Sequence, residues 1–483
     1  MSHPALPKPV HLLTLVAFPV AVLLTTTLAV SISAPAHAAE APPGAQRSVA
    51  TKRLPAVPTG PYFNNPRGSK KARFRIERQV INAIRRTPRR SYIRIALYSF
   101  DRMPVANALL AARRRGVHVQ LLLNDHQDTR AMKILRARLG TNRWSRDFIY
   151  KCRSSCRGTE PDRNLHSKFY TFTRSGRSRH ALMVGSANMM LNADIHQWND
   201  LFVTAGKQRL FDQYVGLFND MRHDYRRNQP SFRFCGRPKG AHCDDAVDRF
   251  TTRVFPKRST RRHDVVLTML DRIQCLTARA DGSQERTRLV LSMHTMRGQR
   301  GNYLASAIRR KYAQGCDLRV NYGLIGYHTK QILGAVTARG RVPLRSTGFD
   351  FTGDREVDRY THQKYFVIRG TYAGRPHTSL TLTGSSNWAS LGTAQDEVFF
   401  TVRGAGTARR YVRNFNLMWR PPNSRAAYTT TYESFRVVRQ QRDASGKLRP
   451  VPELVRRPVT TVEPDGLLRS EERRVGKECR SRW

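Results

Sequence analysis

Apolar side chains recur along the chain with two alternating spacings, one typical of helices and the other of strands. Residues 76–86 and 105–115 have helical spacing, and Gly116 ends the second of these runs. Residues 93–100 and 117–123 are short apolar runs typical of strands. The same order returns later, at residues 265–273, 289–294, 303–312 and 318–322. This alternation predicts an α/β fold with mostly parallel or mixed sheets.

Short sequence landmarks also occur twice in the same order. His166-Ser-Lys168 returns as His362-Gln-Lys364, and Gly185-Ser-Ala-Asn188 returns as Gly384-Ser-Ser-Asn387. Three further pairs of segments match, beginning at residues 95 and 289, 116 and 315, and 200 and 397. All five separations lie between 194 and 199 residues. An internal duplication follows, so we expect two similar α/β lobes.

The two ends of the chain differ from the repeated part. No Asp, Glu, Lys or Arg occurs between Lys8 and Glu40, and the apolar run within that span precedes Ala36-His-Ala38. This pattern predicts a secretory signal peptide that is cut after Ala38, with an uncleaved membrane anchor as the alternative. Residues 469–483 form a charged run without periodicity, which we interpret as translated sequencing-adapter sequence.

These features give a predicted domain plan for the exported protein. The segments are a signal peptide (1–38), an extended lead-in (39–70), a first lobe (71–225), a linker (226–262), a second lobe (263–420), a C-terminal extension (421–468) and the adapter-like tail (469–483). Because one chain carries both half-sites, we expect a monomer.

Basic residues greatly outnumber acidic ones. The 483 residues include 85 Lys and Arg but 35 Asp and Glu, a formal net charge of +50. Hydrophobic residues make up 40%, which argues against disorder throughout. A surface this basic favours anionic partners, including phospholipid head groups, nucleic acid and polyanionic cell wall. Composition does not choose among them.

Six cysteines remain once Cys479 in the tail is set aside. An even number in an exported protein favours disulfides over a metal site. The spacing pairs Cys152 with Cys156 and Cys235 with Cys243, which leaves Cys275 and Cys316, although six cysteines allow fifteen connectivities.

The repeated motifs carry side chains suited to a phosphodiester. Residues 165–172 are interpreted as a strand, which would point His166 and Lys168 to one side. Two copies facing each other would gather the candidate residues His166, Lys168, Ser186, Asn188, His362, Lys364, Ser385 and Asn387. Lysines neutralise phosphate oxygens, Ser and Asn groups hydrogen-bond them, and two imidazoles act as nucleophile and acid.

A carboxylate behind each imidazole would fix its tautomer and favour its charged form. Asp200 and Glu397 begin the following strand in each copy and are the candidates for this role. Trp198 and Trp388 lie near the motifs, where they would either line the pocket or pack in the core.

These residues resemble the signature of the phospholipase D superfamily, H-x-K-x-x-x-x-D followed by G-S-x-N. The resemblance covers roughly residues 60–420. It implies a phosphohistidine intermediate, no metal or other cofactor, and a site at a pseudo-twofold interface between two lobes. By analogy, His166 is the nucleophile and His362 the acid. The motif Asp is replaced by Thr173 and Arg369, which puts the local loop geometry and the substrate in doubt.

The sequence therefore predicts an exported phospholipase D-like phosphodiesterase that cleaves phospholipid head groups and contacts a membrane surface. The alternative is an exported, metal-independent nuclease with the same residues, because phosphate binding needs little beyond positive charge. A third reading is an inactive polyanion binder, which the intact His and Lys of both copies argue against.

Overall fold

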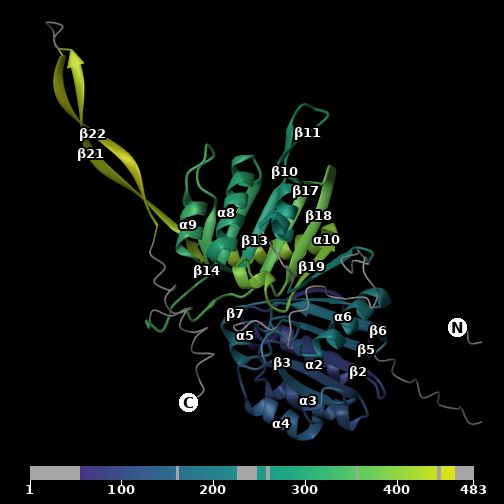
Figure 1. Cartoon of the computed structure of the whole chain (residues 1–483). Coiled ribbons are helices and arrows are strands. Elements are labelled where there is room, and N and C mark those ends of the chain that lie inside the picture. Colours follow the sequence, from purple (N-terminus) through teal and green to yellow (C-terminus); the bar gives the residue numbers. More distant parts are fainter. Residues whose placement is uncertain are drawn as a thin grey trace, which may run out of the picture. The chain divides into compact units, whose positions relative to one another are not determined.

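The computed structural model describes residues 55–158, 163–225, 247–256, 261–354, 357–442 and 448–462, with side chains as far as Tyr428 (Figure 1). Of the two compact units, Met1–Lys52 and Arg53–Trp483, the second holds all of these residues. The predicted signal peptide, the pair Cys235 and Cys243, and the tail over 469–483 lie outside the described residues.

In the first lobe, seven strands of the described chain form one mixed sheet. Their order across the sheet is β1 (Gly60–Phe63), β8 (Asp200–Thr204), β6 (Ser178–Gly185), β5 (Phe169–Ser175), β2 (Tyr92–Leu97), β3 (His118–Asn124) and β4 (Phe148–Cys152). The predicted strands over 93–100 and 117–123 correspond to β2 and β3. Buried Val, Ile and Leu side chains from both strands fill this centre of the sheet.

The second lobe repeats this order in a larger sheet. The path through its described strands is β20 (Arg425–Ala426), β15 (Leu344–Ser346), β14 (Asp317–Ile325), β13 (Arg288–Met296), β17 (Lys364–Tyr372), β18 (Arg375–Gly384), β19 (Glu397–Arg403) and β9 (Phe250–Phe255). A short strand, β10 (Ile273–Gln274), also pairs with β17. Read from β9 to β15, this order matches that from β1 to β4, which is the pattern expected of a duplication.

The α/β fold class is confirmed, and both large sheets are mixed, as the prediction allowed. In the first lobe β2, β3 and β4 are parallel, whereas β1, β8, β6 and β5 pair antiparallel to their neighbours. The reason lies in the connections. Helices cross over between the parallel strands, while a tight turn at Gly176 joins β5 to β6 and requires antiparallel pairing.

Helices cover both faces of each sheet. In the first lobe α2 (Arg75–Arg85), α3 (Met103–Arg114) and α4 (Arg130–Leu139) pack on one face, and in the second α7 (Val265–Asp271), α8 (Gly298–Ala313) and α9 (Tyr327–Gly334) do the same (Figure 1). The other faces share one core with α6 (Gln208–Met221) and α10 (Ala405–Trp419). Because the rings of Phe202 and Phe400 contact each other within that core, with centroids 5.6 Å apart, the two lobes are packed together directly.

The remaining elements complete the fold. They are α1 (Lys70–Arg73), α5 (Leu191–Ile195), β7 (Gln197–Trp198), β11 (Leu276–Ala278), β12 (Gln284–Arg286), β16 (Tyr360–Thr361), β21 (Tyr428–Arg442), β22 (Leu448–Val462) and two 3₁₀ turns at Arg261–His263 and Ser390–Thr393. Strands β21 and β22 pair antiparallel. In the described part of the chain, no helix is both long and apolar enough to cross a bilayer.

The edge strands come from segments that the sequence assigned outside the lobes. Strand β1 lies in the predicted lead-in over 39–70, and β9 lies in the predicted linker over 226–262. Strand β20 lies in the predicted C-terminal extension and pairs with β15. Each edge strand is short, so its periodicity is weak in the sequence.

Two predicted disulfides are present in the structure. Cys152 joins Cys156, and Cys275 joins Cys316. The first closes a loop directly after β4, and the second ties the segment before β11 to the start of β14.

Candidate active site

The two His-x-Lys segments lie just before a central strand and cross to the opposite lobe. His166 and Lys168 precede β5, so the predicted strand over 165–172 begins four residues late, at Phe169. The backbone N–H of His166 donates to the carbonyl of Asp396 at 3.0 Å. In the same way, the N–H of His362 donates to the carbonyl of Trp198 at 2.9 Å. Each motif therefore leaves its own sheet to bond with the other lobe.

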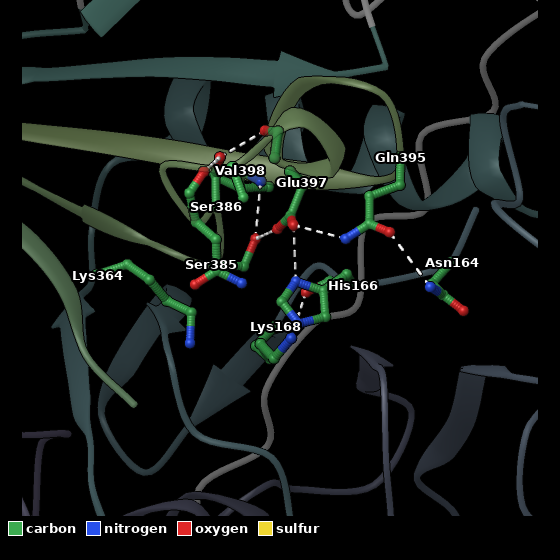
Figure 2. A network of polar contacts seen from close by, with 12 residues as sticks. Asn164, His166, Lys168, Lys364, Ser385, Ser386, Gln395, Glu397 and Val398 are labelled. Carbon is green, nitrogen blue, oxygen red and sulfur yellow. Dashed lines mark hydrogen bonds and ion pairs between the residues drawn. The ribbon is translucent and has the colours of Figure 1, made fainter. Parts of the chain in front are cut away.

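A carboxylate of the second lobe holds the first histidine. Nδ1 of His166 lies 2.7 Å from Oε1 of Glu397, which also accepts from Gln395 Nε2 at 2.9 Å (Figure 2). Ser385 donates its hydroxyl to the other oxygen, Oε2. Burial alone would raise the pKa of Glu397, but His166, Lys168 and Ser385 outweigh it and lower that pKa. Glu397 is thus an ionised acceptor, and Nδ1 of His166 carries the hydrogen.

An amide of the first lobe holds the second histidine. Nδ1 of His362 lies 3.0 Å from Oδ1 of Asn199, which also accepts from the Ser186 hydroxyl at 2.8 Å. The Asn199 amide nitrogen donates to the carbonyl of Ala193 at 3.1 Å, and this contact fixes which way the amide points. His362 therefore also keeps its hydrogen on Nδ1, against a neutral partner. The two half-sites are alike in geometry but different in charge.

The orienting role predicted for Asp200 is held by Asn199. The sequence comparison matched Asp200 with Glu397, but the contacts of the two Gly-Ser loops match Asn199 with Glu397: Ser186 donates to Asn199, and Ser385 donates to Glu397. A slip of one residue in a strand turns a side chain to the opposite face. Asp200 is accordingly buried away from His362, where it accepts from Tyr411 at 2.9 Å and from Thr383.

The lysines and histidines of both copies share one buried electrostatic environment. Burial lowers the pKa of His166 to about 4 and that of Lys168 to about 7, and the charge of Lys364 contributes to the shift of His166. Burial also lowers the pKa of His362 well below its usual value, with contributions from Lys364 and Lys168. The structure thus gathers the four motif residues closely enough to repel one another's charges.

The lysine and serine side chains also hold the local backbone. Lys168 donates to the carbonyl of His166, and Lys364 donates to that of His362. The two serines bond to Asn199 and Glu397, so their predicted phosphate contacts are replaced by contacts that position the groups behind the imidazoles. Figure 2 shows Ser385 and Glu397 above His166, with Lys168 and Lys364 flanking the same space.

The two asparagines lie in the loops after β6 and β18. The backbone N–H of Ser99 donates to Oδ1 of Asn188 at 3.4 Å, and Arg300 donates to the backbone carbonyl of Asn387 at 2.6 Å. No described residue hydrogen-bonds the buried Oδ1 of Asn387. These contacts place both loops beside the site but do not reveal a ligand contact.

Three further rings surround the histidines and were not selected from the sequence. Tyr98 lies 5.3 Å from His166, and it stacks on His126 at 4.0 Å between ring centroids. The His294 ring lies 4.6 Å from that of His362. Strand pairing places Ala96 opposite Phe169 and Ser292 opposite Tyr365, so Tyr98 and His294 occupy equivalent positions. An alignment of the two copies at a separation of 196 residues, rather than 194, would have matched Tyr98 with His294.

The remaining predicted residues belong to the frame of the site. Trp198 and Trp388 are buried, with exposures of 1% and 0%, so they pack in the core and do not line a pocket. Thr173, at the first position of the missing motif Asp, accepts from the backbone N–H of Tyr92 at 3.3 Å. Arg369, at the second, lies within β17 opposite Arg288. Among the described residues, no three His, Cys, Asp or Glu side chains cluster as metal ligands would.

The comparisons with known proteins agree with this geometry. A family model described as "Cardiolipin synthase, PLD-like domain" matches residues 80–222, which contain the first His-x-Lys and Gly-Ser-x-Asn motifs. The second lobe repeats the strand order and both motifs of this domain. Residues 80–222 thus match the model of a phospholipase D-like domain. No curated protein gives a significant match.

Several solved structures are similar to this chain. Phosphatidylserine synthase from Haemophilus influenzae is 10% identical, with 76% of this chain and 87% of that chain covered at a TM-score of 0.47. The phospholipase D family member Nuc from Salmonella typhimurium is 19% identical, with 34% and 94% covered at a TM-score of 0.25. Polyphosphate kinase from Porphyromonas gingivalis is 12% identical, with 74% and 46% covered at a TM-score of 0.45.

The chain thus spans about half the length of that polyphosphate kinase. At these identities and TM-scores, the similarities do not assign a substrate. The match of residues 80–222 to a phospholipase D-like domain agrees with the predicted class of phosphodiesterase-type enzyme.

Proposed function

We propose that the protein is an exported phosphodiesterase that cleaves phospholipid head groups through a phosphohistidine intermediate. The observation that carries the proposal is the pair of differently backed imidazoles, with Glu397 behind His166 and Asn199 behind His362. Two otherwise matched histidines with different partners are suited to different tasks in one reaction.

His166 is the proposed nucleophile. Its Nδ1 hydrogen bonds to Glu397, which leaves a lone pair on Nε2, and its lowered pKa keeps the ring neutral at pH 7. Nε2 attacks phosphorus while the bond from phosphorus to the leaving oxygen breaks. The positive charge that develops on the ring is stabilised by the Glu397 carboxylate, as an adjacent carboxylate stabilises an imidazolium.

His362 is the proposed acid. It gives its Nε2 proton to the leaving oxygen as that oxygen departs. A neutral amide stabilises an imidazolium less than a carboxylate does, so His362 loses its proton more readily than His166. In the second step water or an alcohol attacks phosphorus, passes its proton to His362, and the bond between phosphorus and His166 breaks.

The anion itself prepares the acid for this step. Burial and nearby cations disfavour protonated His362 in the free enzyme. A bound phosphodiester monoanion opposes both effects and raises the pKa of the surrounding bases. Lys168 and Lys364 then stabilise the charge that builds on the equatorial oxygens.

The phospholipid substrate is supported by the family model, whose description names a cardiolipin synthase. Export is supported by the uncharged apolar run before Ala38. Both remain parts of the proposal, and so does action as a monomer at a membrane surface. The nuclease alternative predicts the same two imidazoles, so it must be separated by substrate.

The mechanism is tested with bis(4-nitrophenyl) phosphate, whose leaving group departs without protonation. We expect His362→Asn to form a phosphoenzyme rapidly and hydrolyse it slowly, so that intact-protein mass spectrometry detects the adduct. His166→Asn should form none. His377→Asn, which alters an imidazole that is 81% exposed, is the matched control and should turn over like the wild type. An adduct retained in His166→Asn would refute the assignment.

The substrate is tested separately in the presence of EDTA. Head-group release from phosphatidylglycerol and phosphatidylcholine vesicles is compared with plasmid degradation by the wild type and by His166→Asn. Release that depends on His166 supports the proposal. Plasmid cleavage without release would establish the nuclease, and loss of all activity with chelator would contradict the metal-free mechanism.

A further inference from the structure

A cavity lies away from the catalytic residues, on the outer face of the second lobe. Its volume is about 480 Å³, within the range of small-molecule sites. Helix α7 forms one side of it, and strands β18, β19 and β9 form the floor. None of the motif histidines, lysines or asparagines lines it.

The cavity exists because the second lobe is covered less completely than the first. Helix α2 has 11 residues and packs its apolar side on the sheet of the first lobe, whereas α7, the helix at the same place in the second lobe, has seven. The residues on the strands below these helices differ accordingly. Val203 is buried in the first lobe, whereas Thr401, at the equivalent position of the second lobe, lines the cavity. Strand pairing supports the match, because Val203 pairs with Met183 and Thr401 with Leu382.

The floor of the cavity is apolar. Leu380, Leu382 and Phe399 contribute from adjacent strands, and Val265 and Met269 contribute from α7. The three strand residues are almost fully buried, while the two helical residues are partly exposed. This surface suits hydrocarbon.

The rim is cationic. The cavity is lined by five arginines, which are Arg249, Arg253, Arg272, Arg375 and Arg403. Asp248 is the single acidic residue in its described lining. Asp248 already pairs with Lys207 at 2.8 Å. In the described part of the chain, no carboxylate forms an ion pair with Arg249, Arg272, Arg375 or Arg403. Strand β9 alternates accordingly, with Phe250 and Val254 turned into the shared core and Thr251 and Arg253 turned to the cavity.

We propose that this cavity binds an anionic membrane phospholipid, with acyl carbon on the floor and the phosphate at the arginine rim. Guanidinium groups bind phosphate oxygens in bidentate geometry. An apolar floor contacts acyl carbon favourably but offers no such contact to a hydrophilic polyanion. The site would hold the enzyme on anionic membranes. It is separate from the catalytic centre, and the proposal does not depend on the reaction proposed above.

The test measures binding rather than turnover. Sedimentation with phosphatidylglycerol and phosphatidylcholine vesicles, and titration with monomeric dihexanoyl phosphatidylglycerol, are compared for two variants. Arg272→Gln with Arg375→Gln removes rim charge, and Met269→Trp fills the floor. We expect the double arginine variant to weaken phosphatidylglycerol binding about 30-fold, because each basic residue near an anionic surface contributes about fivefold. Met269→Trp should weaken it about tenfold, because the indole occupies space in which acyl carbon would be buried.

The control variant Arg138→Gln with Arg146→Gln removes the same charge from exposed positions of the first lobe and should bind within about twofold of the wild type. All variants should hydrolyse bis(4-nitrophenyl) phosphate at the wild-type rate. If Met269→Trp does not fold, Thr268→Trp at an exposed lining position replaces it.

Three results would overturn the proposal. One is an equal loss of binding in the control variant, which would indicate general electrostatic adsorption. Another is wild-type affinity in the Trp variant, which would leave the floor without a role. The third is displacement of the lipid by octanoate or by a single-stranded oligonucleotide at equal concentration, which would assign the cavity to a free fatty acid or to nucleic acid.

Discussion

Replacing Lys168 with Met should stabilise the folded protein while removing activity. Lys168 is 1% exposed, and burial lowers the pKa of its ammonium from 10.5 to about 7. Because one pKa unit corresponds to about 1.4 kcal/mol, the buried charge costs about 5 kcal/mol wherever both states are protonated, that is, below pH 7. Between pH 7 and 10.5 the unfolded chain still binds the proton that the folded chain has released, so the cost falls to about 2 kcal/mol at pH 9.

Lys168→Met also loses the hydrogen bond from the ammonium to the His166 carbonyl, which returns about 2 kcal/mol, whereas the attraction to Glu397 is already contained in the lowered pKa. We therefore expect a net gain of about 3 kcal/mol at pH 6 that approaches zero at pH 9. Urea unfolding at both pH values measures it, with Lys133→Met, an exposed lysine on α4, as the control. A gain of the same size at both pH values, or a loss at pH 6, would refute the reasoning.

Three further predictions concern the groups around the anion. Binding of inorganic phosphate at pH 7.5 should take up protons and weaken as the pH rises, because an anion raises the lowered pKa values of Lys168 and His362. Titration calorimetry in Pipes and in Tris measures this proton uptake. Release of protons on binding, or no proton transfer, would contradict the prediction. Asp200→Asn should keep kcat within about threefold, whereas Asn199→Ala should lower it about 10- to 100-fold, and the reverse order would contradict the observed register. Glu397→Gln should slow phosphoenzyme formation about 100-fold even with a 4-nitrophenyl leaving group, and an unchanged single-turnover rate would exclude a stabilising carboxylate.

The fold was predictable where periodicity is strong. The runs over 76–86 and 93–100 became α2 and β2 because each buries a regular apolar face. Strand β9 was assigned to a linker instead, since its six residues alternate between core and arginine-lined cavity and carry little net hydrophobicity. Strand–helix alternation predicted the parallel part of each sheet, and the antiparallel part joins it in one mixed sheet.

The motif residues of the site were predictable from duplication, but their partners were not. Short landmarks align two copies to within a few residues, while contacts in a strand depend on single-residue register. Asn199 was overlooked because the adjacent Asp200 offered the expected chemistry at the expected place. Its role appears only when the Ser186 and Ser385 hydroxyls are traced to their acceptors.

The difference between Glu397 and Asn199 gives the duplicated site a direction. Two identical half-sites would hold a phosphodiester equally well in either orientation, and each imidazole would serve as nucleophile for half of the encounters. A carboxylate on one side favours the charge that forms when His166 bonds to phosphorus, and an amide on the other leaves His362 ready to release its proton. In the proposed mechanism, the substrate is therefore expected to react faster with its leaving group toward His362. The two orientations differ in transition-state energy even though they present the same lysines and nearly the same shape.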